Sequence, residues 1–304
     1  MRKTAIIISS RQRYSLLGSC LESIRDNSKD NVEVYIGCDS DDVETLEVAK
    51  KYKVTAVVGE PSNNRHYSLL NPIARGVDCD YIFTLNDDTT INTKNFGSVI
   101  EETIEEFLQD KPDRIVYGRL QESWPGAPDP KVGMEKQIGF KYACYPVMTK
   151  ETINCLGFVM PNEIPDCGAD IELGRIFNTL KCSNIVPCQV RYLDIPVDVH
   201  DHIGARPPRE PWDFRSPGLA PSYYLWHGGL VLKSLIKLSK HIESTQHQHQ
   251  LKDDDYSFIC EHLPMETRIN EKDGVPVGML PPGCFPIRVG KWLNPDSGLK
   301  WHRF

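Results

Sequence analysis

Short apolar runs alternate with amphipathic segments over the first 120 residues of the chain. Apolar, β-branched runs of strand length stand at 4–9, 32–38, 54–59, 81–85 and 114–120. Apolar residues at helical spacing stand at 14–26, 43–52, 66–77 and 96–108. Pro72 restricts the third of these helices to two short pieces or a late start. Strands separated by helices of this length predict an α/β fold with a mainly parallel central sheet flanked by helices.

The pattern becomes less regular after the fifth predicted strand. Residues 121–135 are rich in Pro and Gly and predict a loop. Thr149 is expected to cap a short helix that ends at Gly157. Apolar spacing then predicts a further helix over 171–180, and a strand at 195–204 ends in a His-rich turn.

The last third of the chain has a different composition. Residues 205–221 are rich in Pro and Arg and predict an extended linker arm. Residues 223–243 form the strongest amphipathic stretch, and the segment after it predicts an irregular tail. We therefore expect a single α/β domain at 1–204 and a C-terminal helical and irregular extension at 205–304.

Polar residues follow several of the predicted strands directly. Ser9, Ser10 and Arg11 come at the end of the first strand, Asp39 follows the second, and the stretch TLNDDT closes the fourth. Ligands of open α/β sheets bind outside the carboxyl ends of the strands. The sequence therefore predicts that these loops meet over one edge of the sheet and form a binding site there.

Charge and short motifs exclude several classes of function. The net charge of −7 disfavours a general nucleic-acid binder, which usually carries a basic stripe. The chain has no GxGxxG after the first strand and no GxxxxGK[ST], so a dinucleotide fold and a P-loop are disfavoured. It has no run of 18 apolar residues, so no transmembrane helix is predicted. Ten cysteines without a CxxC pair predict reduced, structural thiols and a cytoplasmic location.

The acidic patch Asn86, Asp87 and Asp88 needs a partner because adjacent carboxylates repel each other. Hard cations such as Mg²⁺ and Mn²⁺ bind through one or two protein carboxylates together with substrate phosphates. Such a cation neutralises a diphosphate as it leaves. A second interpretation is a solvated turn in which Thr89 or Thr90 caps the next helix.

Four motifs in order resemble GT-A-fold glycosyltransferases, most closely the inverting family-2 enzymes. TLNDDT resembles their Asp-X-Asp-type motif, and TAIIISSRQR resembles the first strand with its nucleotide loop. VYIGCDSDD resembles the second strand, and GADIELGRIF resembles the acidic acceptor motif. The resemblance covers about residues 3–204 and implies transfer of a sugar from a nucleotide diphosphate sugar to a hydroxyl group.

The resemblance implies a cation site and a nucleotide site. Asp88 would bind Mn²⁺ or Mg²⁺, and Asp87 would contact the ribose or the metal; Asn86 stands where many relatives have Asp. Asp39 would accept a hydrogen bond from a uracil-like N–H, which favours a UDP-sugar donor. The other candidates for the nucleotide site are Ser9, Arg11 and Arg65, and the candidates for further metal ligands are His200 and His202.

The resemblance places the catalytic base at Asp170, which would take the proton of the attacking hydroxyl. Glu172 is two residues further on, and residues i and i+2 do not share a helix face. The ordinary interpretation of Asp170 is a first-turn acid favoured by the helix dipole.

Two other functions and several partners stay open. A nucleotidyltransferase would carry glycines in the first loop, which SSRQRYS lacks. A catalytically inactive nucleotide-sugar-binding module is consistent with Asn86 and with Ala169 before Asp170. The acceptor is a glycan, a lipid carrier, a protein or a modified nucleic acid. The helix at 223–243 has three alternatives: packing on its own domain, forming a homodimer, or contacting a membrane surface peripherally through its lysines.

Overall fold

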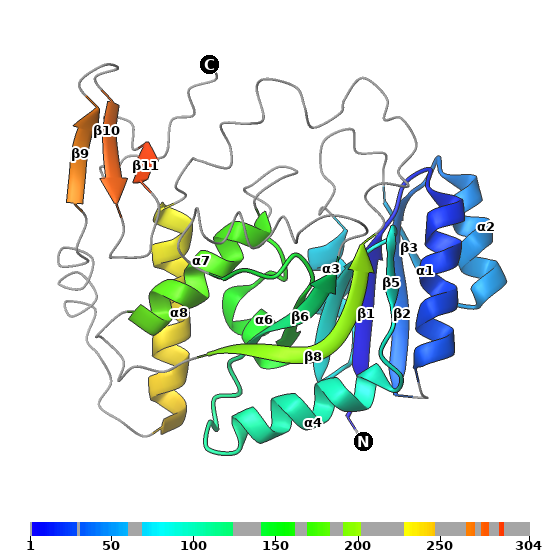
Figure 1. Ribbon diagram of the computed structural model, residues 1–304, viewed down its shortest axis with the longest axis horizontal. Helices are drawn as coiled ribbons and strands as arrows, with labels where there is room; N and C mark the ends of the chain where they lie inside the picture. Colours follow the sequence, from blue (N-terminus) through cyan, green and yellow to red (C-terminus); the bar gives the residue numbers. More distant parts are fainter. Residues whose placement is uncertain are drawn as a thin grey trace.

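The computed structural model describes ten segments of the chain (Figure 1). They are residues 2–28, 31–59, 69–123, 141–161, 169–182, 191–201, 228–246, 266–270, 275–279 and 286–288. The sheet that organises them has eight strands in the order β3-β2-β1-β4-β7-β6-β8-β5.

The first half of the sheet is parallel and lies where the sequence predicts it. It contains β1 (Thr4–Ser9), β2 (Val32–Asp39), β3 (Thr55–Gly59) and β4 (Tyr81–Asn86). The strands are connected through α1 (Tyr14–Asn27), α2 (Val43–Tyr52) and α3 (Leu70–Gly76), and α4 (Phe96–Leu108) comes later in the chain. The side chain of Asp42 caps α2 by accepting from the Thr45 amide, as the sequence suggests.

The second half of the sheet is mixed. It contains β5 (Thr89–Ile91), β6 (Tyr117–Ser123), β7 (Pro146–Thr149) and β8 (Tyr192–Asp201). β7 is antiparallel to β4 and β6, β5 is antiparallel to β8, and β6 is parallel to β8. The predicted α/β fold with a mostly parallel sheet is confirmed, and β5 and β7 are additions that the sequence pattern did not indicate.

The structure corrects one predicted strand boundary and one capping interpretation in this region. The strand predicted at 114–120 begins only at Tyr117, because the amides of Ile115 and Val116 bond to side-chain oxygens of Asp113 and Thr152 rather than to another strand. Thr89 and Thr90 lie in β5 and do not cap the next helix, because α4 has Asn95 at its N-cap position.

Helices cover both faces of the sheet (Figure 1). One apolar cluster packs α1, α2 and α4 on one face. A second cluster packs α3, α6 (Lys150–Leu156), α7 (Ala169–Cys182) and α8 (Gly228–Gln246) on the other face. Thr149 caps α6, which ends at Gly157 in the left-handed region (φ +89°). The core therefore has three layers with the sheet in the middle.

The helix α8 packs against the α/β core. Its residues Val231, Leu235, Leu238 and Ile242 are buried in the same cluster as α6 and α7. The Lys237 ammonium group also donates to the Leu156 carbonyl at 3.0 Å, at the carboxyl end of α6. Packing on its own domain was one of three alternatives for this helix. The structure shows that packing for the apolar face of α8. The boundary predicted at residue 204 stays a prediction.

The remaining described elements are three short strands. β9 (Glu266–Asn270), β10 (Val275–Met279) and β11 (Pro286–Arg288) form a separate antiparallel sheet. Among the helices that the structure describes, none combines the length and the apolar character needed to cross a membrane. Five cysteines in the described segments carry free thiols: Cys20, Cys38, Cys79, Cys144 and Cys155.

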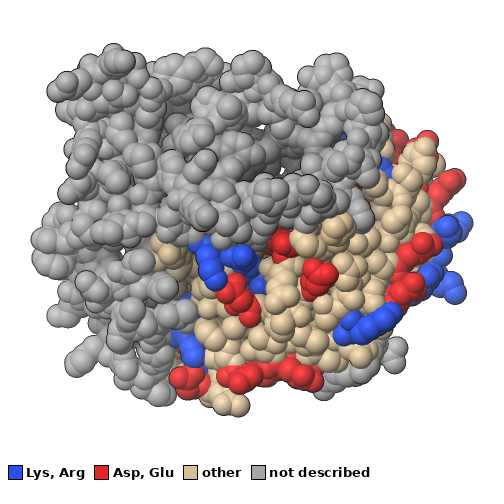
Figure 2. Space-filling model, viewed as in Figure 1, with Lys and Arg blue, Asp and Glu red and all other residues tan. Residues whose placement is uncertain are grey.

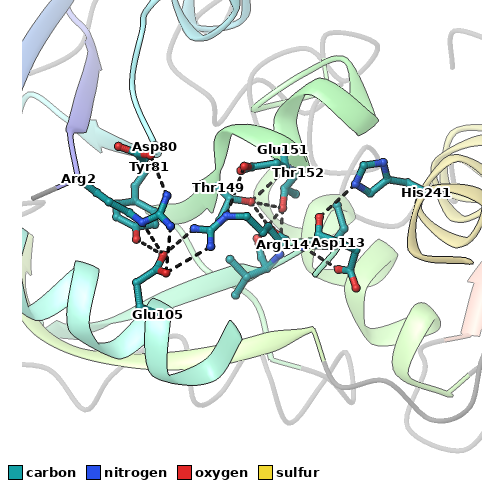
Figure 3. Close-up of polar contacts among 12 residues, drawn as sticks. Arg2, Asp80, Tyr81, Glu105, Asp113, Arg114, Thr149, Glu151, Thr152 and His241 are labelled. Carbon is teal, nitrogen blue, oxygen red and sulfur yellow. Dashed lines mark hydrogen bonds and ion pairs between the residues drawn. The ribbon is translucent and has the colours of Figure 1, made fainter. Parts of the chain in front are cut away.

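A cluster of charged residues closes the amino end of the sheet (Figure 3). Glu105 of α4 accepts from Arg2, from Tyr81 and from Arg114, whose Nη2 lies 2.6 Å away. Arg2 also pairs with Asp80, and Arg114 also pairs with Glu151. We call these six residues the Glu105 cluster. It ties α4 to the amino ends of β1 and β4.

On the face seen in Figure 2, the described surface carries acidic and basic side chains interspersed with each other. This distribution fits the absence of a basic stripe in the sequence. It gives the described part of this face no surface typical of general nucleic-acid binding.

Candidate functional site

The carboxyl ends of β1, β2 and β4 bring three polar loops together. The strands are in parallel register, with Ser9 opposite both Gly37 of β2 and Asn86 of β4. The residues just beyond these ends are Ser10, the loop after Asp39, and Asp87 with Asp88. The structure therefore assembles the edge that the sequence predicted.

Asp87 and Asp88 are buried, each with an exposed fraction of 1%. The Ser10 hydroxyl donates to Asp87 Oδ2 at 2.8 Å, and the Arg13 guanidinium pairs with Asp87 Oδ1. Arg13 Nη2 also lies 3.5 Å from Asp88 Oδ2. We call Ser10, Arg13, Asp87 and Asp88 the acidic-site cluster. One guanidinium thus faces two adjacent carboxylates.

Burial raises the pKa of Asp87 to about 6. The nearby charge of Asp88 acts in the same direction as burial, and Arg13 and Ser10 offset part of the rise. Burial also raises the pKa of the neighbouring Cys20 thiol, whose Sγ lies 3.7 Å from the Asn86 carbonyl. This thiol is therefore a neutral packing group beside the site.

Arg11 contacts acidic residues at the carboxyl end of β2. Its guanidinium pairs with Asp39 Oδ2, and its Nη2 lies 3.3 Å from Asp41 Oδ2. Asp39 is largely buried, whereas the Asp41 side chain is 51% exposed. Because a carboxylate offers about four acceptor positions, Asp39 retains capacity for a further donor such as a base N–H.

The pairing of β5 with β8 brings a predicted metal ligand near the acidic residues. His200 lies opposite Thr90, two residues after Asp88 in the chain. His200 Nδ1 is 3.1 Å from the Ser123 hydroxyl, so this contact orients the ring. The backbone register therefore supports a location of His200 beside the end of β4.

The first turn of α7 carries Asp170 and Glu172 in different surroundings. Asp170 is half-buried, and its charge adds to the rise in the pKa of Tyr117 and Tyr142, which burial mainly causes. Glu172 is buried and lies 3.3 Å from Arg175, which is also buried. Burial raises the pKa of Glu172 to about 7 even though Arg175 lowers it. Glu172 is thus held in an ion pair within the helix.

The donor groups fit a hard divalent cation. Among the described residues, no group of three or more His, Cys, Asp or Glu side chains is arranged to hold a metal ion alone. Magnesium in nucleotide enzymes usually takes only one or two protein carboxylates and completes its shell with phosphates and water. The two adjacent buried carboxylates of Asp87 and Asp88 supply the one or two protein ligands that such an arrangement needs.

The structure describes seven of the nine residues predicted for the site. Ser9, Arg11, Asp39, Asp87 and Asp88 lie at the carboxyl edge of the parallel strands, and His200 lies on the strand paired with β5. Asp170 lies in the first turn of α7. Arg65 and His202 fall outside the described residues, so their roles stay predictions.

The sequence pattern placed Ser10 at this edge but did not indicate its bond to Asp87, and it indicated no role for Arg13. Arg13 is two residues after Arg11, and both arginines follow the first strand. The signal that could have found Arg13 is this position, because the loop after the first strand was expected to meet the acidic residues.

The comparisons with known proteins agree with this geometry. The family model described as "Glycosyl transferase family 2" matches residues 5–167, more than half of the chain. That range covers β1 from its second residue onward, all of β2 and the acidic residues after β4. No curated protein sequence matches the chain.

Solved structures show the same fold at low sequence identity. S. aureus TarS is 12% identical with a TM-score of 0.51, and the match covers 85% of this chain and 42% of TarS. This chain therefore corresponds to less than half of TarS. A TarS 1–349 structure is 11% identical with a TM-score of 0.51, covering 80% of this chain and 72% of that one.

A third solved structure is the mannosyltransferase PcManGT from Pyrobaculum calidifontis, in complex with GDP-Man and Mn²⁺. It is 13% identical with a TM-score of 0.47, and the match covers 86% of this chain and 79% of that one. The TarS matches establish a GT-A-like fold.

Proposed function

The chain belongs to glycosyl transferase family 2, and on that premise we propose that it moves a sugar from a UDP-sugar to a hydroxyl acceptor with inversion. Membership of the family makes it a nucleotide-sugar glycosyltransferase. The proposal adds the identity of the base, the need for a divalent cation, and a single displacement as the chemical step.

One observation carries the proposal: Asp87 and Asp88 are buried side by side at the carboxyl edge, next to the loop that follows Asp39. Buried excess charge is unfavourable unless a cation compensates it. Asp88 would hold Mg²⁺ or Mn²⁺, with His200 or His202 as a further ligand. The cation, when bound, would neutralise the charge that develops on the leaving diphosphate.

The neighbouring residues bind the nucleotide. Asp39 accepts the base N–H of uracil, while Ser9 and Arg11 line the pocket. Asp87 contacts the ribose side or the metal, and Arg65 contacts the sugar or a phosphate. The preference for UDP rests on Asp39, because its carboxylate is fixed by Arg11 and keeps free acceptor positions.

Asp170 is the general base of the proposed reaction. The acceptor oxygen attacks the anomeric carbon as its proton passes to the Asp170 carboxylate, and the bond from that carbon to the diphosphate breaks. The half-buried position of Asp170 supports this role, because a substrate group can reach it. Glu172 is less suited because it is already paired with Arg175.

The remaining proposals concern the surroundings of the reaction. We place the catalytic domain at 1–204 and assign the extension at 205–304 to the acceptor side. The free thiols of the described cysteines are consistent with a cytoplasmic, reducing location.

A panel of nucleotide sugars tests the proposal by thermal shift with and without Mn²⁺. We expect a UDP-sugar to raise the melting temperature, and we expect the shift to require Mn²⁺. Binding that is independent of metal for every donor would contradict the proposal.

A second candidate is a nucleotide-sugar-binding module without catalysis, which Asn86 and Ala169 favour because both replace an acid of the family pattern. Hydrolysis of the bound UDP-sugar in the presence of Mn²⁺ separates the two functions. An active transferase slowly transfers the sugar to water and releases UDP. A binding module leaves the UDP-sugar intact.

A further inference from the structure

We propose that Arg13 is a positioning residue that acts as a fixed counter-charge for Asp87 and Asp88, so that the protein binds its divalent cation tightly only together with the nucleotide diphosphate. This inference rests on the proposed function, because it assumes a cation at Asp88. It assigns a task to a side chain that no sequence motif selected.

Arg13 contacts both carboxylates of the acidic-site cluster. Its guanidinium pairs with Asp87 and lies 3.5 Å from Asp88 Oδ2, and its side chain is only 19% exposed. Asp87 is held from its other oxygen by the Ser10 hydroxyl at 2.8 Å. A planar guanidinium can address two carboxylates at once, which a single ammonium does less well. Arg13 therefore fixes the orientation of the two acids.

The fold holds Arg13 in this place from three directions. The Ser10 amide donates to the Gly37 carbonyl at 3.0 Å, and the Gln12 amide donates to Asp42 Oδ2 at 2.6 Å. The Arg13 carbonyl accepts the first hydrogen bond of α1, from Leu17 at 3.0 Å. The loop is thus anchored to β2, to the cap of α2 and to α1.

The positive charge of Arg13 affects how strongly the two carboxylates attract a cation. The Arg13 guanidinium places one positive charge beside the two buried carboxylates of Asp87 and Asp88. Coulomb attraction scales with net charge, so Arg13 reduces the attraction of the empty site for a divalent cation. A bound diphosphate adds negative charge and oxygen ligands of its own. With Arg13 weakening the site for cation alone, tight binding of the cation therefore requires the nucleotide.

A purely structural Arg13 would only anchor the start of α1. The two roles differ in one measurable quantity, the affinity of the nucleotide-free protein for metal. A structural anchor does not alter that affinity when the protein stays folded, whereas a counter-charge does.

The experiment measures Mn²⁺ binding to the full chain by electron paramagnetic resonance, with and without UDP. In Arg13→Gln, we expect the nucleotide-free protein to bind Mn²⁺ at least about tenfold more tightly than wild type, because a competing positive charge is removed. We also expect sugar transfer to become slower, because the two acids lose the guanidinium that fixes their orientation.

Arg25→Gln is the matched control. Arg25 lies in the last turn of α1, whereas Arg13 is the residue before its first turn. The Arg25 side chain is 63% exposed and pairs with Asp26. This variant removes the same charge near the other end of the helix and should leave Mn²⁺ affinity unchanged. An unchanged Mn²⁺ affinity in folded Arg13→Gln would overturn the proposal.

Arg13→Lys provides a second test that retains the charge. We expect Mn²⁺ affinity within about threefold of wild type, because the charge is kept, and slower transfer, because the fork that holds both acids is lost. Transfer at the wild-type rate would overturn the positioning role, including when Arg13→Gln does not fold. If wild-type protein binds no Mn²⁺ even with UDP, the proposed metal-dependent function fails instead.

Discussion

The two ends of the central sheet carry similar charged residues but treat them differently. At the amino end, the Glu105 cluster combines Arg2 and Arg114 with three acids (Figure 3). At the carboxyl end, the acidic-site cluster combines Arg13 with two acids. Each cluster has one more acid than it has arginines.

Burial separates the two clusters. The acids of the Glu105 cluster have side chains that are 34–39% exposed, so water solvates their excess charge. Asp87 and Asp88 have side chains that are at most 1% exposed. An excess charge that water cannot reach requires a cation or a proton. Charge composition alone therefore does not distinguish a structural cluster from a binding site.

The pKa of Glu105 and the pKa of Asp87 are shifted in opposite directions. Burial alone would raise the pKa of Glu105, but hydrogen bonds from Arg114 and Tyr81 lower it below its ordinary value. Burial raises the pKa of Asp87 to about 6 in spite of Arg13. Glu105 therefore stabilises the fold in its charged form, whereas the Asp87 carboxyl resists being charged.

Asp88→Asn should have the largest effect on function. We expect sugar transfer to fall by about 10³-fold or more, because the proposed cation ligand is lost and the leaving diphosphate is no longer neutralised. Transfer assays and Mn²⁺ binding with UDP check this result. Asp110→Asn, at a side chain that is 82% exposed, is the control. Full activity in Asp88→Asn would remove the distinction between the two ends of the sheet.

Asp170→Asn should have the second largest effect. Loss of a general base costs about 10²–10⁴-fold in rate, and the isosteric amide leaves the helix start in place. Binding of UDP with Mn²⁺ should stay at the wild-type level, which titration calorimetry can measure. Normal transfer by this variant would show that the base is a different residue, and Glu172→Gln would be the next variant to assay.

Glu105→Gln should affect stability and leave function alone. It removes the carboxylate that Arg2, Tyr81 and Arg114 share, so we expect the free energy of unfolding to fall by about 2 kcal/mol. Denaturant titration measures the change, with Glu102→Gln at an exposed position of the same helix as the control. A loss of transfer in the folded variant would contradict a structural role for this end.

The lowered pKa of Glu105 also predicts a pH dependence. Its contribution to stability is fully present above the pKa of the unfolded chain and is lost as the pH falls through the folded pKa. The difference in stability between wild type and Glu105→Gln should therefore shrink in acid. A difference that is constant with pH would contradict this assignment.

Asp87→Asn should show the smallest effect on the pH dependence of stability, with the opposite sign to Glu105→Gln. A raised carboxyl pKa means that, between about pH 4 and 6, the unfolded chain ionises while the folded protein keeps its proton. Stability from this group is therefore lost as the pH rises. In wild type, we expect this group to lower the free energy of unfolding by about 1 kcal/mol as the pH rises from about 5 to 6. Asp87→Asn should not show this decrease. An identical pH profile in variant and wild type would contradict the shift.

The parallel half of the fold could be predicted from sequence because its signals are local. β1, β2 and β4 are apolar runs with consistent strand length, and α1 and α4 have clear helical spacing. The short strands β5 and β7 could not be predicted, because three or four residues carry no periodicity. Their extended form depends on partners distant in the chain.

By itself, the sequence determined the acidic residues, the strand that positions them and the family pattern around them. The tertiary structure decided which arginine neutralises them. Gln12 adopts a left-handed backbone (φ +55°), and its amide bonds to Asp42. This turn directs Arg11 to Asp39 and Arg13 to Asp87. Two arginines that are equivalent in a local pattern acquire different partners, because the partners come from β2 and β4 and meet only when the sheet forms.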